Sequence, residues 1–481
     1  MSPPAAAPST RLAIPARVGG LLKGAMDALG RGKWSAAVDL LAASAVQDIQ
    51  HEGMTFLASA SAAGVVGELY ERAFRGAGIV PQEILPLRTG GPLRVLYVCP
   101  GLSRGQAATD RLLNVVERHD RGRVIPMVMG AEEFTARTPA CAVLQWPGVP
   151  SAAHREAIER LERAGVEARF APTSGSYLHA APAAIEAARA MRPDVAVFIA
   201  SSACPVQAAM AFARVAPVQV NQNIGSPLVM VGVDAAIYRS ASMARADAPE
   251  LEKRGVRVIE MPAAGTDLDA AARCAALPRE KVGVPADAVL FVSAGNKLAQ
   301  RLVMGGFARD LGVFLREQKE VWWMGIGPGD FSSALAEFER AGVCGRVVLT
   351  GGLADIRPAL KTGDVYLNEY PEGGSNTVME AMACGLPVVA ARHGGVDGGG
   401  AGAAAHCAAI GAEIAGDQGV EMTAYWREAG RLVSDARLRA ERGRSSRARA
   451  EERFGFAALV AAYEACYAEL AGAGGDGRAA P

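Results

Sequence analysis

The sequence predicts an α/β protein built from two Rossmann-like halves in tandem, preceded by a small helical region. From residue 93 onward, short β-branched runs alternate with alanine-rich helical stretches, which is the pattern of a parallel sheet. The pattern restarts after Pro278, so we expect a second sheet. Residues 18–74 contain only helical periodicity. In sheets of this type, ligands bind beyond the carboxyl ends of the strands.

Each element follows from a local pattern. The Pro and Gly residues at 81–92 mark a boundary after the helical region. Strands are expected at 94–99, 124–129, 142–145, 194–200, 218–220 and 235–238 in the first half, and at 288–293, 321–324, 346–349, 364–367 and 387–391 in the second. The predicted domains are a helical region (1–90), a first Rossmann-like half (91–276), a second half (277–455), and a C-terminal helix and tail (456–481).

The composition excludes several classes of protein. The 481 residues, 50% hydrophobic and 21% charged, are typical of a globular chain. Lys+Arg and Asp+Glu both number 50, so no nucleic-acid or membrane-surface partner is indicated. No apolar run is long enough to predict a transmembrane segment. The 8 cysteines lack metal-finger and CxxC spacing, and the first residues lack the layout of a secretion signal, so we expect a cytoplasmic protein.

The most informative segment is 370–391, YPEGGSNTVMEAMACGLPVVAA. A loop carrying Glu372 opens a short helix that carries Glu380. Glycines and polar residues at the helix start gather free backbone N–H groups at the positive end of the helix dipole, which favours a phosphate. These residues are Gly373, Gly374, Ser375, Asn376 and Thr377. Because carboxylates accept hydrogen bonds from sugar hydroxyls, the segment predicts a nucleotide-sugar site.

The same residues also have a structural interpretation. Thr377 and Glu380 have the spacing of a capping box, and Gly373 and Gly374 can relax a tight turn. Taken one at a time, the residues favour that interpretation. Two carboxylates separated by seven residues and followed by Ala-Met-Ala-Cys-Gly-x-Pro form a much rarer combination, which favours ligand binding.

This segment resembles the donor site of GT-B glycosyltransferases, above all the retaining Glu-x7-Glu group, glycosyl transferases group 1. The resemblance implies that Glu372 contacts the donor sugar and that Glu380 contacts the nucleotide ribose. The Gly-Gly-Ser-Asn-Thr run is also similar to the phosphate-binding loop of O-GlcNAc transferase and of bacterial protein N-glucosyltransferases. Both relatives imply a GT-B fold with a C-terminal bracing helix and transfer of a hexose from a nucleotide diphosphate sugar, most often UDP-linked.

Further donor-side residues follow the strands expected in the second half. Asn296, Lys297 and Arg301 come after strand 288–293, where a cation can neutralise the diphosphate of a leaving nucleotide. Lys297 matches both groups of relatives, so we expect Lys297 and Glu372 to be catalytic. Gly327 and Gly352 follow the next two strands and resemble loops that lie near the donor and its base.

The first half should bind the acceptor. Its first strand-to-helix turn contains Gly105 but lacks the His that inverting relatives carry there. Residues 214–227 resemble an Arg-x-Ala-Pro-x-Gln segment of these relatives, which places Gln222 and Ser226 on the acceptor side, although Ser226 replaces an expected ring. His179 and the other histidines match no family position securely.

The missing His and the two glutamates favour a retaining, metal-independent transferase without a cofactor beyond its nucleotide-sugar substrate. No Asp-x-Asp suited to Mg²⁺ or Mn²⁺ follows a predicted strand. Two alternatives stay open: a non-catalytic GT-B scaffold that binds a partner glycosyltransferase, and an inverting protein O- or N-glycosyltransferase. An epimerase of nucleotide sugars would need further acidic residues and a His in the crevice. The acceptor is expected to be a protein or a glycan, and the N-terminal helices either recruit it or cover an apolar face.

Overall fold

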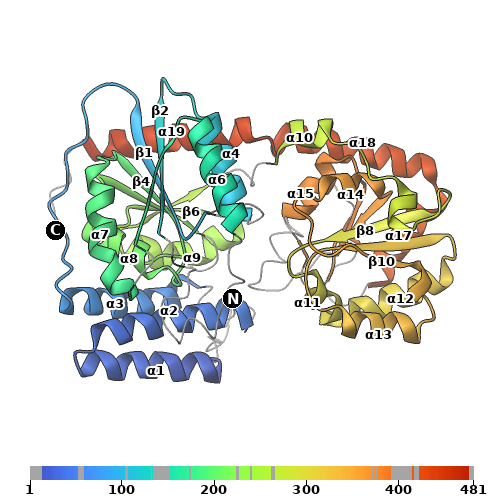
Figure 1. The fold of residues 1–481 in the computed structure, drawn as a ribbon, viewed down its shortest axis with the longest axis horizontal. Helices are drawn as coiled ribbons and strands as arrows, with labels where there is room; N and C mark the ends of the chain where they lie inside the picture. Colours follow the sequence, from blue (N-terminus) through green and yellow to red (C-terminus); the bar gives the residue numbers. More distant parts are fainter. Residues whose placement is uncertain are drawn as a thin grey trace, which may run out of the picture. The chain divides into compact units, whose positions relative to one another are not determined.

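The computed structural model describes residues 14–51, 59–102, 107–131, 133, 151–172, 175–223, 227–238, 241–261, 266–370, 373–374, 376–391, 414–415 and 422–475. The chain divides into two compact units, which are visible in Figure 1. The first unit comprises Met1–Ser103, Asp120–Glu260 and Cys466–Pro481, and the second comprises Arg104–His119 and Met261–Ala465.

The first unit contains a parallel sheet of seven strands in the order β3-β2-β1-β4-β5-β6-β7. The strands are β1 (Leu93–Cys99), β2 (Val124–Gly130), β3 (Glu167–Phe170), β4 (Val195–Ala200), β5 (Val218–Asn223), β6 (Ala235–Tyr238) and β7 (Arg257–Glu260). The strand order reverses between β1 and β4, as in a Rossmann sheet. Helices α6 (Ser151–Arg163), α7 (Tyr177–Ala190), α8 (Pro205–Ala213) and α9 (Ala241–Lys253) connect these strands, and α4 (Ala107–Arg118) groups with the second unit.

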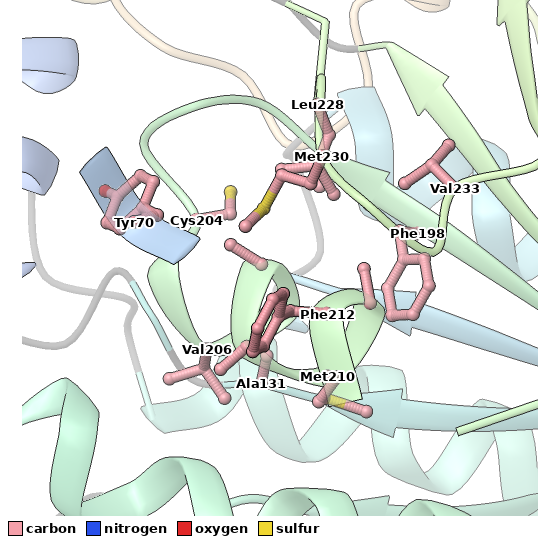
Figure 2. Close-up of a cluster of buried hydrophobic side chains, with 14 of the residues drawn as sticks. Tyr70, Ala131, Phe198, Cys204, Val206, Met210, Phe212, Leu228, Met230 and Val233 are labelled. Atoms are coloured by element: carbon pink, nitrogen blue, oxygen red, sulfur yellow. The ribbon is translucent and has the colours of Figure 1, made fainter. Parts of the chain in front are cut away.

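Three N-terminal helices share the core of the first unit: α1 (Ala16–Gly30), α2 (Trp34–His51) and α3 (Ala60–Gly76). α1 buries one apolar stripe at helical spacing, formed by Val18, Leu22, Ala25 and Leu29. α2 packs against α7, and α3 packs against α8 and α9. In Figure 2, Tyr70 of α3 lies in the same buried cluster as Phe212 of α8 and Phe198 of β4. The helical region therefore covers an apolar face of the first Rossmann-like half.

The second unit contains a parallel sheet of six strands in the order β10-β9-β8-β11-β12-β13. The strands are β8 (Val289–Ala294), β9 (Val321–Ile326), β10 (Val347–Leu349), β11 (Val365–Leu367), β12 (Val388–Ala391) and β13 (Ile414–Ala415). The helices are α10 (Leu268–Arg273), α11 (Leu298–Val303), α12 (Phe307–Glu317), α13 (Ser332–Arg340), α14 (Arg357–Thr362), α15 (Asn376–Ala383), α17 (Met422–Ser434) and α18 (Ala436–Arg453). Separate apolar clusters cover the two faces of the sheet.

Two tandem parallel sheets confirm the predicted architecture, and most expected strands lie within one or two residues of the observed ones. The strand expected at 142–145 lies outside the described residues. The prediction missed β3, β7 and β13. β3 and β7 are largely exposed edge strands with charged residues, and β13 has two residues, so none of them has an apolar run to reveal it.

The predicted bracing helix is α19 (Phe456–Gly475). It begins in the second unit, and its residues from Cys466 onward belong to the first. There the ring of Tyr467 lies 6.2 Å from that of Tyr97 in β1, and Glu469 pairs with Arg257 of β7. None of the helices in the described ranges is long and apolar enough to cross a membrane.

Candidate functional site

The candidate site lies at the carboxyl ends of β8 and β11, adjacent strands at which the order of the second sheet reverses. Parallel α/β sheets bind ligands at this point because the loops leaving the two strands turn to opposite faces. The loop after β8 begins with Gly295, Asn296 and Lys297. The loop after β11 begins with Asn368 and Glu369 and leads to the predicted glycine loop. The structure thus brings together two segments that the sequence analysis selected separately.

Gly373 and Gly374 pack closely on the ends of these strands. The Gly374 amide donates to Asn368 Oδ1 (2.8 Å). A side chain at Gly373 would collide with Asn368, and one at Gly374 would collide with Thr377. A Cβ on Gly374 would also lie 3.7 Å from the Ala294 carbonyl oxygen at the end of β8. Glycine is therefore required here for close approach of the backbone, which also suits a loop that must approach a ligand.

The start of α15 excludes the capping-box interpretation of Thr377 and Glu380. α15 begins at Asn376, so Thr377 lies inside its first turn and is not the N-cap. The Thr377 hydroxyl lies 2.9 Å from the hydroxyl of the buried Tyr366, which donates to the Ala294 carbonyl oxygen (3.2 Å). The Thr377 hydroxyl thus links α15 to β11 and β8. The position of Glu380 is therefore not explained by a capping box.

Glu380 is a largely buried carboxyl group on α15. Burial raises its pKa to about 7, and the positive charge of Arg357 opposes that shift. Arg357 begins α14 and donates to both oxygens of Asp355 (2.7 and 2.9 Å). The loop after β10, which contains Gly352, therefore meets α15 at Glu380. This arrangement suits a carboxylate and a backbone loop that share one nucleoside.

The cation that the structure places at the two strand ends is Arg301. A Cβ on Gly295 would lie 3.4 Å from Arg301 Nη1, so the guanidinium lies against the end of β8. Its Nη1 is 3.9 Å from Oε2 of Glu369, whose side chain is 0% exposed. Lys297, which the sequence analysis favoured, is exposed next to the first turn of α11, as is Asn296. Both cations thus follow β8, one partly buried against the sheet and one facing solvent.

An aromatic cluster fixes the segment that leads into the glycine loop. The Tyr425 hydroxyl donates to the Asn368 carbonyl oxygen (3.1 Å). The Tyr370 hydroxyl donates to Asp310 (2.8 Å) and accepts from Trp426 Nε1 (3.0 Å). Helices α12 and α17 therefore hold residues 368–370 from two sides, and the chain enters the glycine loop from a rigid base.

Gly327 and Gly352 differ in their surroundings. Gly327 is buried, its amide donates to the Gly351 carbonyl oxygen (3.0 Å), and a side chain on it would collide with the Gly295 carbonyl oxygen. It therefore joins the loops after β8, β9 and β10. Gly352 is exposed beside Pro328, in a loop whose backbone faces solvent.

Several predicted residues lie outside the described part of the chain: Glu372, Ser375, Gly105 and Ser226. Their predicted roles stay predictions. Asn376 is described, and its side-chain Oδ1 is buried at the start of α15.

The acceptor-side motif of the first half forms a structural network. Arg214 donates to both oxygens of Asp234 (2.9 and 2.8 Å) and to the Gly232 carbonyl oxygen (2.8 Å). Gln219 binds Ala211, Val215 and Gly232 through its side chain. Gln222 is 5% exposed within β5. This network holds α8, β5 and β6 together and accounts for the Arg-x-Ala-Pro-x-Gln pattern without a ligand.

His154 is a residue that the sequence analysis did not select. Its Nδ1 lies 2.7 Å from the Leu102 carbonyl oxygen, in the turn after β1, where the order of the first sheet reverses. Since a carbonyl only accepts, Nδ1 carries the proton, and Nε2 of the neutral ring is left as an acceptor. Only tertiary packing brings α6 to this turn, so no sequence signal pointed to it. His179 lies at the first turn of α7 instead.

Within the described ranges, no group of three or more His, Cys, Asp or Glu residues is arranged to hold a metal ion. The charged side chains that interact with one another at the site are Arg301 with Glu369, and Arg357 with Asp355 and Glu380.

Part of the second unit matches a known family. Residues 287–414 match the family described as "Glycosyl transferases group 1". The match spans the strands of the second sheet together with Lys297, Arg301 and the glycine loop. For this part of the second unit, the match confirms the predicted resemblance to glycosyl transferases group 1. None of the curated proteins searched matches the chain.

Solved structures share the fold over most of the chain. A mutant of the O-GlcNAc transferase of Thermobaculum terrenum is 17% identical, with a TM-score of 0.57 over 95% of this chain and 98% of that one. HepE of Anabaena in complex with UDP is 16% identical, with a TM-score of 0.56 over 78% of this chain and 100% of its own. A glycosyltransferase of Rickettsia africae is 13% identical, with a TM-score of 0.57 over 79% of this chain and 98% of that one. At these identities the likeness establishes the GT-B fold.

Proposed function

We propose that this protein transfers a hexose from a nucleotide diphosphate sugar to a protein or glycan acceptor, and that the nucleotide of the donor is UDP. The observation that carries the proposal is the meeting of Arg301, the glycine loop and the start of α15 at the ends of β8 and β11. A cation beside the start of a helix suits a diphosphate. Glu380 suits the ribose, and HepE, which shares the fold, was solved with UDP, with UDP and glucose, and with UDP-glucose.

The proposed reaction needs stabilisation of the charge that develops on the leaving diphosphate. Arg301 and Lys297 supply positive charge after β8, and the amides of the glycine loop supply dipoles. Side chains carry these charges, so transfer is expected to proceed without a divalent ion. Glu372 would orient the sugar. We favour retention of configuration, in which the leaving phosphate can itself accept the proton of the acceptor.

Donor binding tests the site directly. Calorimetric titration with UDP-glucose is compared for the wild type, Arg301→Ala, Lys297→Ala and the control Arg340→Ala, which removes an exposed arginine of α13 paired with Glu337. Loss of a charge-assisted contact with the diphosphate should weaken binding by about 10- to 100-fold, and the control should bind as the wild type does. If Arg301→Ala and Lys297→Ala bind UDP-glucose as tightly as Arg340→Ala, the diphosphate lies elsewhere.

Transfer and its stereochemistry require separate measurements. The anomeric configuration of the product, followed by NMR, distinguishes retention from inversion, and activity in excess EDTA tests metal independence. Activity that EDTA abolishes and Mn²⁺ restores would overturn the metal-free proposal. Donor binding without transfer, combined with copurification of a second transferase, would indicate the scaffold function instead.

The position of His154 favours a second candidate, an inverting transferase of the O-GlcNAc-transferase type. Its Nε2 can accept a proton from an acceptor hydroxyl or amide near the turn after β1. His154→Gln should then lower kcat at least 100-fold without changing the affinity for UDP-glucose. An unchanged kcat leaves retention as the favoured course.

A further inference from the structure

Glu369 is a buried carboxyl group in an unusual electrostatic setting. It is the second residue after β11, and both of its oxygens are buried without a hydrogen-bond partner among the described residues. Arg301 supplies an opposite charge at 3.9 Å, and the buried Nε of Arg301 likewise has no partner in the described ranges. Folded proteins rarely leave buried charged groups without hydrogen bonds, so this pair calls for an explanation beyond stability.

The groups that face Glu369 come from three elements. Arg301 of α11 supplies the positive charge, while Tyr366 of β11 presents a hydroxyl already held by Ala294 and Thr377. The backbone amides of Glu369 itself and of Gly374 also favour the ionised form, although the Gly374 amide donates to Asn368. Burial outweighs these contacts and raises the pKa of Glu369 to about 7. Both protonation states are therefore accessible near neutral pH.

Arg301 connects this carboxyl group to the ligand side of the strand ends. Its side chain is 18% exposed and lies against Gly295, while Glu369 is fully enclosed behind it. An anion that binds the exposed edge of the guanidinium competes with Glu369 for the same positive charge. Two anions around one cation disfavour the ionised form of the one that can be protonated.

We propose that Glu369 is a proton-coupled partner of Arg301: ionised Glu369 balances the guanidinium in the free protein and takes up a proton from solvent when a nucleoside diphosphate sugar binds. This inference rests on the proposed function. No bond of the donor changes in this step, since the proton moves from solvent to a carboxylate oxygen of Glu369 and the guanidinium keeps its own. Glu369 is a positioning residue that acts through Arg301.

Calorimetry in buffers of different ionisation enthalpy measures this proton directly. The probe is UDP-glucose, because its diphosphate is substituted at both ends and has no group that titrates near pH 7. The wild type is expected to take up a fraction of a proton at pH 7, and its affinity should fall roughly three- to tenfold between pH 6 and pH 8. In Glu369→Gln both effects should disappear while binding persists.

Glu380→Gln is the matched control, because Glu380 is the other carboxyl group at the site whose pKa burial raises to about 7. Hydrogen bonds from a ribose would favour its ionised form and release a proton, which is the opposite sign. Proton uptake should therefore persist or increase in Glu380→Gln. Arg301→Gln is a second variant for the case that Glu369→Gln does not fold. It should bind UDP-glucose more weakly, and at saturating UDP-glucose it should take up no proton; uptake equal to that of the wild type would overturn the proposal.

The outcomes separate the two proposals. UDP-glucose binding with equal proton uptake in the wild type and Glu369→Gln overturns the coupled pair and leaves the donor site intact. If proton uptake disappears in Glu380→Gln, the coupled pair is also overturned, because Glu380 is then the carboxyl group that takes up the proton. No binding of UDP-glucose or of other nucleotide sugars to the wild type contradicts the proposed function itself.

Discussion

Replacement of Gly327 by Ala tests how tightly the loops around the donor site must pack. A Cβ on Gly327 would lie 2.2 Å from the Gly295 carbonyl oxygen, whereas ordinary contacts begin at 3.4 Å. The loops after β8 and β9 must therefore separate by about 1 Å, because the Gly295 carbonyl group is backbone and cannot rotate away as a side chain could. Overpacking of this kind costs about 1–3 kcal/mol. The same shift moves the segment that carries Lys297, and a misplacement of about 1 Å can reduce turnover about 100-fold.

Urea denaturation and a transfer assay measure the two effects on one preparation. The matched control is Gly345→Ala, because Gly345 has no atom within 4 Å of an added Cβ. It should change the free energy of unfolding by less than about 0.5 kcal/mol. If Gly327→Ala unfolds at the same urea concentration as Gly345→Ala and retains full activity, the close approach of Gly327 to Gly295 does not constrain the site.

Three further predictions concern the residues around the sheets. The pKa of Glu369 is higher in the folded protein than its unfolded value of 4.5, so the folded protein binds the Glu369 proton more tightly. The protonated carboxyl group therefore favours folding at low pH, and this contribution to stability is lost as the pH rises from 4.5 to 7. Glutamine does not ionise, so Glu369→Gln should avoid this loss of up to about 3 kcal/mol. Its free energy of unfolding should exceed that of the wild type at pH 8 but not at pH 5, and equal values at pH 8 would contradict the prediction. Tyr366→Phe leaves the Ala294 carbonyl oxygen without its side-chain donor and should cost about 1–3 kcal/mol in thermal denaturation, more than Tyr→Phe at an exposed site. Asp234→Ala should destabilise the protein by about 3 kcal/mol by leaving Arg214 unpaired. It should change UDP-glucose affinity less than twofold in the folded protein, and a large loss of affinity would show that this motif takes part in donor binding.

The sequence alone determined the features that depend on neighbouring residues. The alternation of apolar runs and helices predicted two parallel sheets, because a buried parallel strand needs a continuous apolar run. The donor loop was found because glycines, polar helix-start residues and Glu380 lie within one short segment. The edge strands β3 and β7 escaped detection, since exposed strands need no such run.

Only the tertiary structure decided which chemical groups meet. Arg301 and Glu369 are distant in sequence and adjacent in space because β8 and β11 pair at the point where the strand order reverses. The same packing excluded a capping box at Thr377, brought His154 to the turn after β1, and gave Arg214 and Asp234 a structural role. Local patterns report whether a segment is helix, strand or turn, whereas charge pairing and burial depend on strand order, which no single segment encodes.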